Sequence, residues 1–438
     1  MTPGSKFCAR LGLASLALLA IAAAPVRVTP AAARPAIAAP KPTTPAAANV
    51  TPQIFLSADG TIVYMIGALT DDSFLRFDSL LLTAPKARTV FLASPGGLTI
   101  EGRLIAALVR KRHLDTYVEN YCASACTQVF VAGRERTIGP EGELGFHQAV
   151  GVDETGETSA LAAASTRHLS PLTVFGINGN DTLRLAYEQA GIDPPFIAKA
   201  LARGHEDMWL PSAAELTASH VITRRAARSE LALPEGSYSR AEIAAMIAGR
   251  PMWRAARTAL PRAYAEAIND AWRRANTGST LVEAISSGRA AIVVAAWPQL
   301  AASSDPILDR MLALYASSAR NQRLRGYPMC KEGLNDQAGP VDPMDSQFEE
   351  SEDQLLIELF SSADKGKPLS LNDARKTFDR DVVPVMVRSY LQTDIKSTSA
   401  SCRLGFKIFE AIDELPAKKR VKAYRALLSL PEMAVGPV

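Results

Sequence analysis

The sequence predicts an α/β domain followed by an all-helical domain. Between about residues 53 and 150, short apolar runs typical of strands alternate with segments of helical periodicity, the pattern of a right-handed α/β domain with parallel strands. After about residue 233 the strand signal ends, and amphipathic segments rich in Ala and Arg follow. A chain of 438 residues is also too long for one ordinary core, so more than one domain is expected.

The first fifty residues are not expected to belong to either domain. Lys6 and Arg10 precede an apolar run of about fifteen residues, short of the roughly 20 that a membrane span needs. Residues 1–24 are therefore predicted to be a signal peptide cleaved after the alanines at 22–24, with a later cut after Ala33 or an uncleaved membrane anchor as alternatives. Residues 25–52, mostly Ala, Pro, Thr and Val, are predicted to be an extended linker. Every one of these outcomes places the rest of the chain outside the cytoplasm, in the periplasm or an equivalent space.

The elements of the first domain, predicted over residues 53–228, follow from apolar spacing. Strands are predicted where short runs of Val, Ile, Tyr or Phe end at turn residues, and helices where apolar residues recur at helical spacing. In chain order these are a strand at 61–69, a helix at 71–85, a strand at 87–94, a helix at 99–112, a strand at 115–119, a buried helix at 124–133, a short strand ending at His147, a surface loop at 151–170, and helices at 180–191, at 194–204 and after Pro211-Ser212.

The second domain, predicted over residues 235–438, is expected to be helical throughout and to serve packing or interaction. An acidic stretch at residues 342–353 is expected to be a loop between its helices. The Arg clusters at 253–257 and 270–274 are interpreted as solvated helix faces. The formal net charge of the whole chain, +3, argues against a nucleic-acid binder, which carries a concentrated basic face.

The cysteines suggest pairing rather than chemistry. Cys8 lies in the predicted signal peptide, which leaves Cys122, Cys126, Cys330 and Cys402. Outside the cytoplasm these residues can form disulfides, and Cys122–Cys126 with Cys330–Cys402 keeps each pair within one predicted domain. A zinc site needs a second Cys or His pair at matching spacing, and a thioredoxin-like motif needs Cys-x-x-Cys. The sequence has neither, so no metal and no cofactor are predicted.

Ser124 lies between two alanines at the start of a predicted helix. At that place its Oγ lies beside backbone N–H groups and the positive helix end, where an alkoxide is best tolerated, although an ordinary N-cap serine has the same position. The stretch SPGG at 94–97 ends a strand with two glycines, which lets a backbone N–H approach a carbonyl oxygen. His147, one of only five histidines, ends a later strand. Together these three features favour a catalytic serine.

In this order, the strands, helices, SPGG, small-Ser-small and His-Gln motifs resemble the proteolytic subunit of Clp protease, in the crotonase-like superfamily. The stretch CASAC at 122–126 is similar, more narrowly, to the nucleophile segment of a group of periplasmic Clp-protease-like proteins. The resemblance covers about residues 54–225 and implies a ββα-type spiral domain of the crotonase and Clp-protease kind.

The resemblance implies an exported serine endopeptidase, a hydrolase that acts on polypeptides without a cofactor. It makes Ser124 the nucleophile and His147 the general base, with the N–H groups of Gly97 and Ala125 as the oxyanion hole.

The acidic member of the triad is matched less directly. In the family it precedes an aromatic-Leu-Ser-Ala-x-Glu-Ala stretch, and HEDMWLPSAAEL at 205–216 occupies that place with one residue more. Asp207 is the best match, with Glu206 and Asp193 as alternatives.

Two features depart from the family. Its cytosolic members form barrels that dock to an ATP-driven unfoldase, and an exported chain has no ATP supply, so no such partner is expected. Residues 151–179, where those members have a long oligomerising helix, read as a loop. A Clp-type oligomer is therefore not predicted, while another homo-oligomer and an N-terminal membrane attachment stay open.

Two other functions compete with the peptidase. One is a catalytically silent binding or scaffold module on the same fold. The other is acyl-CoA chemistry on a crotonase-like fold, which uses the same paired N–H groups on a thioester oxygen. It is discounted because coenzyme A is not expected outside the cytoplasm.

Overall fold

The computed structural model of the chain describes residues 53–149, 151–152, 158–159, 179–204, 207–326, 343–363, 366–384, 387 and 398–430. The described residues form two compact units. The α/β unit comprises those of Pro42–Ile243 together with Asp270–Ala284, and the helical unit comprises those of Ala244–Asn269 and Ile285–Val438. The predicted signal peptide and linker lie outside the described residues. The sequence predicts a second domain over 235–438, whereas residues 235–243 and Asp270–Ala284 group with the α/β unit.

The α/β unit is built on a six-stranded sheet of order β1-β2-β3-β4-β6-β10. Its strands are β1 (Gln53–Leu56), β2 (Ile62–Ile66), β3 (Thr89–Ala93), β4 (Asp115–Val118), β6 (Arg136–Ile138) and β10 (Arg224–Arg225). All neighbouring strands pair in parallel except β1, which pairs antiparallel with β2 at the sheet edge. The predicted α/β class with parallel strands is confirmed, and β1 is an antiparallel addition to it.

A second, smaller sheet carries the residues of interest. It consists of β5 (Tyr121–Ala123) and β7 (Glu143–Gly145), which pair in parallel with Ala123 opposite Gly145. Two further short strands, β8 (Gly151–Val152) and β9 (Thr158–Ser159), pair antiparallel.

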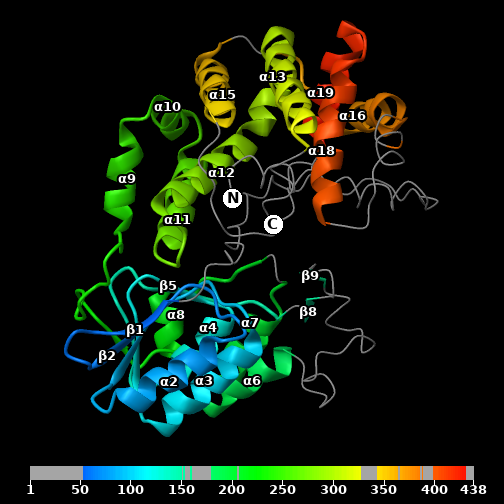
Figure 1. Cartoon of the computed structure of the whole chain (residues 1–438). Helices are drawn as coiled ribbons and strands as arrows, with labels where there is room; N and C mark the ends of the chain where they lie inside the picture. The colour runs from blue at the N-terminus through cyan, green and yellow to red at the C-terminus, as the bar shows by residue number, and fades with distance from the viewer. Residues whose placement is uncertain are drawn as a thin grey trace. The chain divides into compact units, whose positions relative to one another are not determined.

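Helices cover one face of the large sheet. They are α2 (Ser73–Thr83), α3 (Thr99–Lys111), α4 (Ala125–Val131), α6 (Gly179–Gln189), α7 (Pro194–Leu201) and α8 (Ala213–Ala218). Figure 1 shows α2, α3, α4 and α6 packed side by side against that face. Their buried side chains, such as Phe77, Ile105 and Val129, join Met65 and Leu92 of the strands in one core. Each such side chain contributes about 1.5–3 kcal/mol when it is fully buried.

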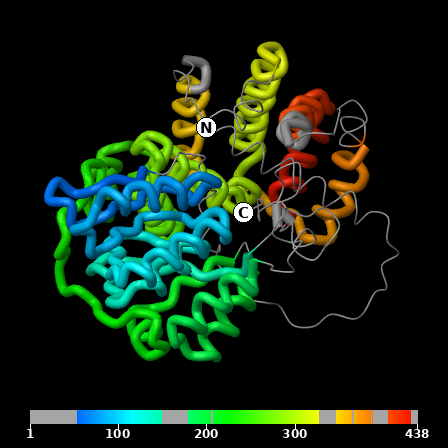
Figure 2. Tube along the Cα trace, turned by 60° about the horizontal axis from the view of Figure 1, so that its bottom comes forward, coloured from blue at the N-terminus to red at the C-terminus, as the bar shows by residue number. Residues whose placement is uncertain are grey.

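On the opposite face of the sheet, side chains of the strands pack against Ala226 and Leu231 of the segment that follows β10. Rings from four neighbouring strands lie in a row across this face, with centroid distances of 5.0 Å from Phe55 to Tyr64, 5.3 Å from Tyr64 to Phe91 and 6.0 Å from Phe91 to Tyr117. The Tyr64 hydroxyl donates to the carbonyl oxygen of Ala232 at 2.7 Å, which fixes the segment that leaves β10. In the tube of Figure 2, the blue, cyan and green segments of this unit lie side by side.

The C-terminal region is largely helical, as predicted. It contains α9 (Arg240–Ala248), α10 (Pro251–Ala259), α11 (Pro261–Ala275), α12 (Leu281–Ala301), α13 (Asp305–Leu324), α15 (Pro343–Ser361), α16 (Leu371–Thr377), the π-helix η3 (Phe378–Val382), α18 (Thr398–Asp413) and α19 (Ala417–Ser429). Among the described helices, α12 is long and apolar enough to cross a membrane. Its side chains Ile292, Ala296 and Leu300 are buried against other parts of the protein, which is typical of a core helix.

The prediction of an acidic loop at 342–353 is wrong, because α15 begins at Pro343 and runs through it. The acidic side chains near its middle are neutralised from the neighbouring helix. Arg289 of α12 lies 2.8 Å from Glu352 and 2.6 Å from Asp353, and the Tyr315 hydroxyl donates to Glu352 at 2.5 Å. A long-range cation therefore makes the helix stable where the local charge pattern suggested a loop.

The interpretation of both Arg clusters as solvated faces is half wrong. Arg254 and Arg257 are exposed, as expected. Arg273 and Arg274 are only 5% and 3% exposed. Arg274 forms an ion pair with Asp270 at 2.9 Å, which offsets the loss of hydration that burial imposes on a guanidinium.

Candidate active site

Ser124 lies at the turn from β5 into α4, with backbone angles φ 53° and ψ −127°. A positive φ is uncommon outside glycine. Among the described residues, His113 and His220 share it, but both follow the end of a helix, where left-handed residues are common. Ser124 alone of these three begins a helix. This sharp strand-to-helix turn is the geometry of a nucleophile elbow, which presents a serine hydroxyl at the end of a sheet.

The turn is held by its backbone and by a neighbouring helix. The Ser124 N–H donates to the carbonyl oxygen of Gly145 at 2.9 Å. The Ser124 carbonyl accepts from the Thr127 N–H at 3.0 Å and from the Thr127 hydroxyl at 2.6 Å. That hydroxyl lies 2.7 Å from the Tyr187 hydroxyl of α6, whose pKa is raised by burial. The Ser124 side chain makes no capping hydrogen bond, so it does not act as an ordinary N-cap.

The two cysteines close the turn on either side of the serine. Cys122 of β5 and Cys126 of α4 form a disulfide, with Cα atoms 5.5 Å apart. Both cysteines are buried, whereas Ser124 between them is half-buried. The other predicted pair, Cys330 and Cys402, lies outside the residues whose side chains are described, so that pairing stays a prediction.

The SPGG stretch lies directly against the serine turn. Gly96 has φ 105°, and a Cβ built on it would lie 2.6 Å from the Ser124 Cβ and 3.1 Å from the Ala125 nitrogen. Gly97 has φ 136°, and its Cβ would lie 2.2 Å from the carbonyl oxygen of Leu69. Only glycine fits at either position. The sequence predicts no separate role for Gly96, although the adjacent pair of glycines is a signal for one.

The two N–H groups assigned to the oxyanion hole are available. Within the described part of the chain, neither the Gly97 N–H nor the Ala125 N–H has an intramolecular acceptor. Ala125 is the first residue of α4, so its N–H points out at the positive end of the helix. Gly96, the residue before Gly97, lies against Ser124 and Ala125.

His147 leaves the small sheet at the same edge as Ser124. Because Ala123 pairs with Gly145, Ser124 follows one strand and Phe146 and His147 follow the other. His147 is 4% exposed. Phe146 exchanges two hydrogen bonds of 2.9 Å with Trp209, and the Gln148 N–H donates to Arg203 at 2.9 Å. The backbone is thus fixed on both sides of the imidazole.

The three candidate acids lie in different places. The antiparallel bridge from Phe146 to Trp209 brings Asp207 alongside the segment that carries His147, and its carboxylate accepts from Arg203 at 3.0 Å. Asp193 lies 2.9 Å from the Nδ1 of His220, a different histidine. Glu206 lies outside the described residues. Of the two described acids, Asp207 is the one on the segment beside His147.

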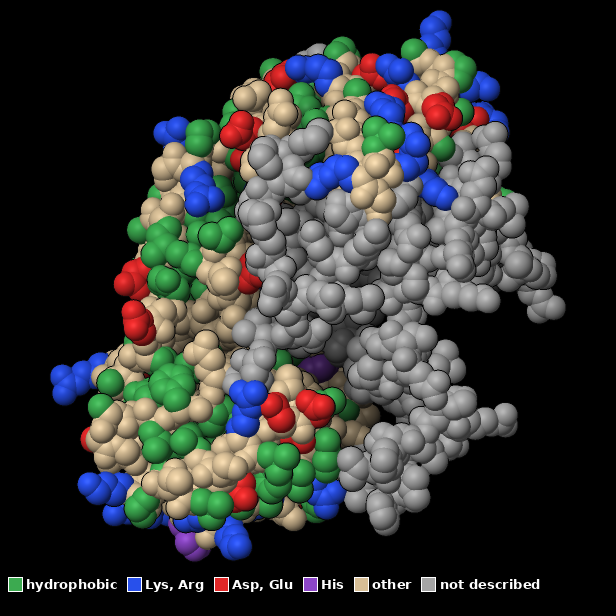
Figure 3. Space-filling view, in the orientation of Figure 1, with side chains coloured by type: hydrophobic (Ala, Val, Ile, Leu, Met, Phe, Trp, Pro, Cys, Tyr) green, Lys and Arg blue, Asp and Glu red, His purple; other side chains and the backbone are tan. Residues whose placement is uncertain are grey.

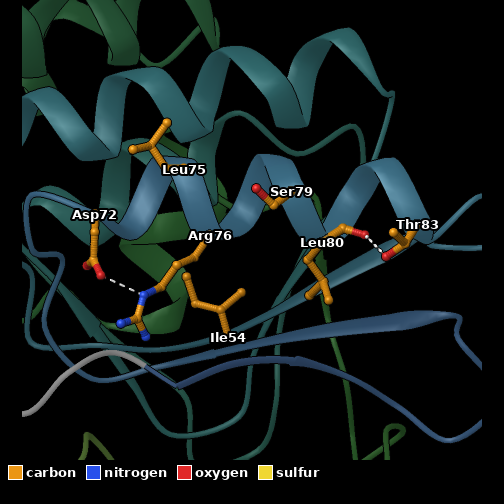
Figure 4. A pocket seen from close by; sticks show the side chains of 7 residues that line it. All are labelled: Ile54, Asp72, Leu75, Arg76, Ser79, Leu80 and Thr83. Atoms are coloured by element: carbon orange, nitrogen blue, oxygen red, sulfur yellow. Dashed lines mark hydrogen bonds and ion pairs between the residues drawn. The ribbon is translucent and has the colours of Figure 1, made fainter.

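A separate pocket of about 560 Å³ lies over α2 and the edge strand β1 (Figure 4). Its lining is Ile54, Asp72, Leu75, Arg76, Ser79, Leu80 and Thr83. The only charged side chains among these, Asp72 and Arg76, pair with each other at 2.6 Å. None of the predicted site residues lines this pocket, and nothing in its chemistry suggests a reaction.

The charged side chains on the visible face of the molecule are mixed in sign. Figure 3 shows Lys and Arg interspersed with Asp and Glu over the described residues of that face. This distribution fits the small formal net charge of +3.

Comparison with known proteins found no family model and no curated protein that matches the chain. Three solved structures that resemble part of the chain are proteases. One is a ClpP1 mutant from Listeria monocytogenes, 16% identical, with a TM-score of 0.29, covering 39% of this chain and 94% of that one. Another is a mutant of the 1510-N membrane-bound stomatin-specific protease, which is 15% identical with a TM-score of 0.28 and covers 38% of this chain and 77% of that one. A third is the ClpP protease catalytic domain from Plasmodium falciparum, which is 16% identical with a TM-score of 0.28 and covers 40% of this chain and 89% of that one. Function therefore has to be judged from this chain's own residues.

Proposed function

We propose that the α/β unit is a serine peptidase with Ser124 as its nucleophile. The observation that carries the proposal is the backbone of Ser124, a non-glycine residue with φ 53° where a strand turns into a helix. Such a conformation costs on the order of 1–3 kcal/mol and is maintained only where the surroundings over-determine it. Here the disulfide, the Thr127 hydroxyl and the contact with Gly96 all hold the turn.

The proposed reaction follows from the order of these groups. The Ser124 Oγ attacks the carbonyl carbon of a peptide bond, and its proton passes to His147. The carbonyl oxygen, now negative, accepts hydrogen bonds from the N–H groups of Gly97 and Ala125. His147 then gives its proton to the leaving amine, and water hydrolyses the acyl-enzyme by the same steps. In this scheme Asp207 orients the imidazole.

The proposal includes the compartment and the fold family. A disulfide beside the nucleophile supports an oxidising compartment, which agrees with the signal-like N-terminus. The order of motifs supports a crotonase and Clp-protease-like spiral domain of the periplasmic kind. Its substrates are then polypeptides that are small or already unfolded, because no ATP-driven unfoldase operates there.

One observation favours the alternative of a catalytically silent binding module. The Asp207 carboxylate is engaged by Arg203 at 3.0 Å. A carboxylate held by an arginine in every state would not orient His147, and the triad would lack its third member.

A fluorophosphonate probe separates the two functions, since it reacts only with an activated serine. The wild-type protein is expected to be labelled at one residue, Ser124→Ala is expected to give no label, and His147→Ala is expected to react at least a hundredfold more slowly. Ser79→Ala, a change at an exposed serine of α2, is the control and should label as wild type. A folded wild-type protein without label, or equal label on Ser124→Ala, would leave the silent module as the function.

A further inference from the structure

The segment Asp270–Ala284 groups with the α/β unit although it comes late in the chain. One of its two buried arginines, Arg273, reaches the small sheet formed by β5 and β7. The Arg273 Nε donates to the Glu143 carboxylate at 2.8 Å, and the Arg240 guanidinium donates to the other carboxylate oxygen at 2.5 Å. Glu143 is the first residue of β7, four positions before His147. Two arginines therefore hold the start of the strand that leads to the proposed base.

The same arginine also lies beside the strand that leads to the nucleophile. The Arg273 guanidinium carbon lies 5.5 Å from the centroid of the Tyr121 ring, and Tyr121 is 1% exposed. Tyr121 begins β5 and pairs directly with Glu143. Each strand is only three residues long, about 10 Å, so a rotation at its start is transmitted to its end.

Arg273 and Arg240 are themselves fixed in place. The Arg240 guanidinium carbon lies 3.6 Å from the centroid of the Trp272 ring, and the Trp272 side chain is fully buried. The Asn276 side chain accepts from the N–H of Tyr238 at 3.0 Å and donates to its carbonyl at 2.9 Å. The C-terminal end of α11 and the segment before α9 are thus hydrogen-bonded to each other. These contacts restrict the side-chain conformations of Arg273 and Arg240.

Stability alone does not account for this arrangement. Burying a guanidinium costs several kcal/mol, and a buried ion pair is often no more stabilising than apolar side chains of the same volume. For Arg273, burial acts to lower the pKa, but Glu143, Tyr121 and Asp270 together outweigh it and the net pKa is raised, so the side chain stays charged. Hydrogen bonds to both carboxylate oxygens do, however, fix the orientation of the Glu143 side chain.

We propose that Arg273, together with Arg240, is a positioning residue for the reaction at Ser124. By holding Glu143 and Tyr121, it fixes the orientation of β5 against β7, the two strands whose ends lead to Ser124 and His147. The proposal rests on the peptidase function proposed above, and it makes the segment Asp270–Ala284, which lies beyond the Clp-like region, a necessary part of the active unit.

The test compares variants of the full-length protein by the rate of fluorophosphonate labelling as a function of pH. Arg273→Met keeps the volume of the side chain and removes the hydrogen bond, so it is expected to lower the rate about a hundredfold, the usual effect of misplacing reacting groups by about 1 Å. Arg273→Lys restores the charge and is expected to recover part of the rate. Because the position of His147 changes, the acid limb of the pH profile is expected to shift in Arg273→Met as well.

The matched control is Arg224→Met, which also removes an arginine that joins two carboxylates, Glu135 and Glu230, but at the far edge of the large sheet. It should label within twofold of wild type. If Arg273→Met does not fold, Arg240→Met removes the hydrogen bond to the other Glu143 oxygen from a more exposed side chain. About a tenfold loss of labelling rate is then expected.

Amide hydrogen exchange separates the two proposals. Faster exchange at residues 121–127 and 143–148 in Arg273→Met, with β2 to β4 unchanged, supports the positioning role directly. If the wild-type protein labels and both Arg273→Met and Arg240→Met label as fast as wild type, the positioning role alone is overturned. Wild-type protein that does not label overturns the peptidase and, with it, the role of Arg273 in a reaction.

Discussion

Replacing Gly96 with alanine is expected to displace Ser124 without removing any reacting group. The added Cβ would lie 2.6 Å from the Ser124 Cβ and 2.8 Å from the Ala123 carbonyl oxygen, where unbonded carbons normally stay about 3.5–4.0 Å apart. One side of the contact must therefore move by about 1 Å. The disulfide, β5 and α4 hold the serine side, and the φ of 105° at Gly96 adds a backbone penalty for alanine of about 1–2 kcal/mol.

The expected result is a labelling rate about a hundredfold below wild type, since a misplacement of about 1 Å costs roughly that much in well-aligned reactions. The rate is measured with the fluorophosphonate probe, and folding is checked by the urea midpoint of unfolding. Gly60→Ala is the matched control, because Gly60 has a positive φ of 74° but no heavy atom within 4 Å of the added Cβ. It should lose stability of the same order through the backbone alone and label at the wild-type rate.

The reasoning is refuted if Gly96→Ala and Gly60→Ala both label at the wild-type rate. That outcome would mean that the SPGG stretch yields to the methyl group, and that the loop does not define the position of Ser124. A rate lost equally in both variants would point instead to global destabilisation.

Three further outcomes are expected. Thr127→Val removes a hydroxyl that holds the Ser124 carbonyl and leaves a buried tyrosine hydroxyl unpaired, so the free energy of unfolding should fall by about 1–3 kcal/mol in a urea titration. Changing Cys122 and Cys126 together to alanine should lower the free energy of unfolding by on the order of 2 kcal/mol and slow labelling. A thiol reductant added to the wild type should slow labelling in the same way. Unchanged rates would mean that the disulfide has no part in presenting the serine. Asp207→Asn should slow labelling at least a hundredfold, whereas Asp193→Asn, whose partner is His220, should stay within twofold, and the reverse order would exchange their roles.

The periodicity of apolar residues predicts the elements of the fold that are long enough to show a period. The buried runs that become β2, β3 and β4 and the helical spacing of α2 and α3 were all visible in the sequence, because each element is long enough to show its period. The strand β5 was not, since three residues cannot establish a period of two. Its existence depends on pairing with β7, twenty-two residues further along.

The site divides in the same way. Ser124, the SPGG glycines and His147 could be chosen as candidates from sequence because each lies at a boundary of a predicted element. The candidate acid stays open among Asp207, Glu206 and Asp193 in the sequence, because the bridge between Phe146 and Trp209 that places Asp207 beside the His147 segment is a long-range contact. Arg273 was misread for the same reason: a buried arginine and a solvated one look alike in sequence until the partner, here 130 residues away, is known.

The composition of the α/β unit also bears on how the chain is made. Synthesis proceeds from the N-terminus at about 5–20 residues per second, and domains generally fold as they emerge. This unit cannot be completed when Ile243 appears, because Asp270–Ala284 is still missing. For a few seconds at that rate, a nascent chain would hold its serine, its histidine and both glycines but not the arginine at the base of their strands. The order of synthesis thus delays the completion of the α/β unit until Ala284 has been made.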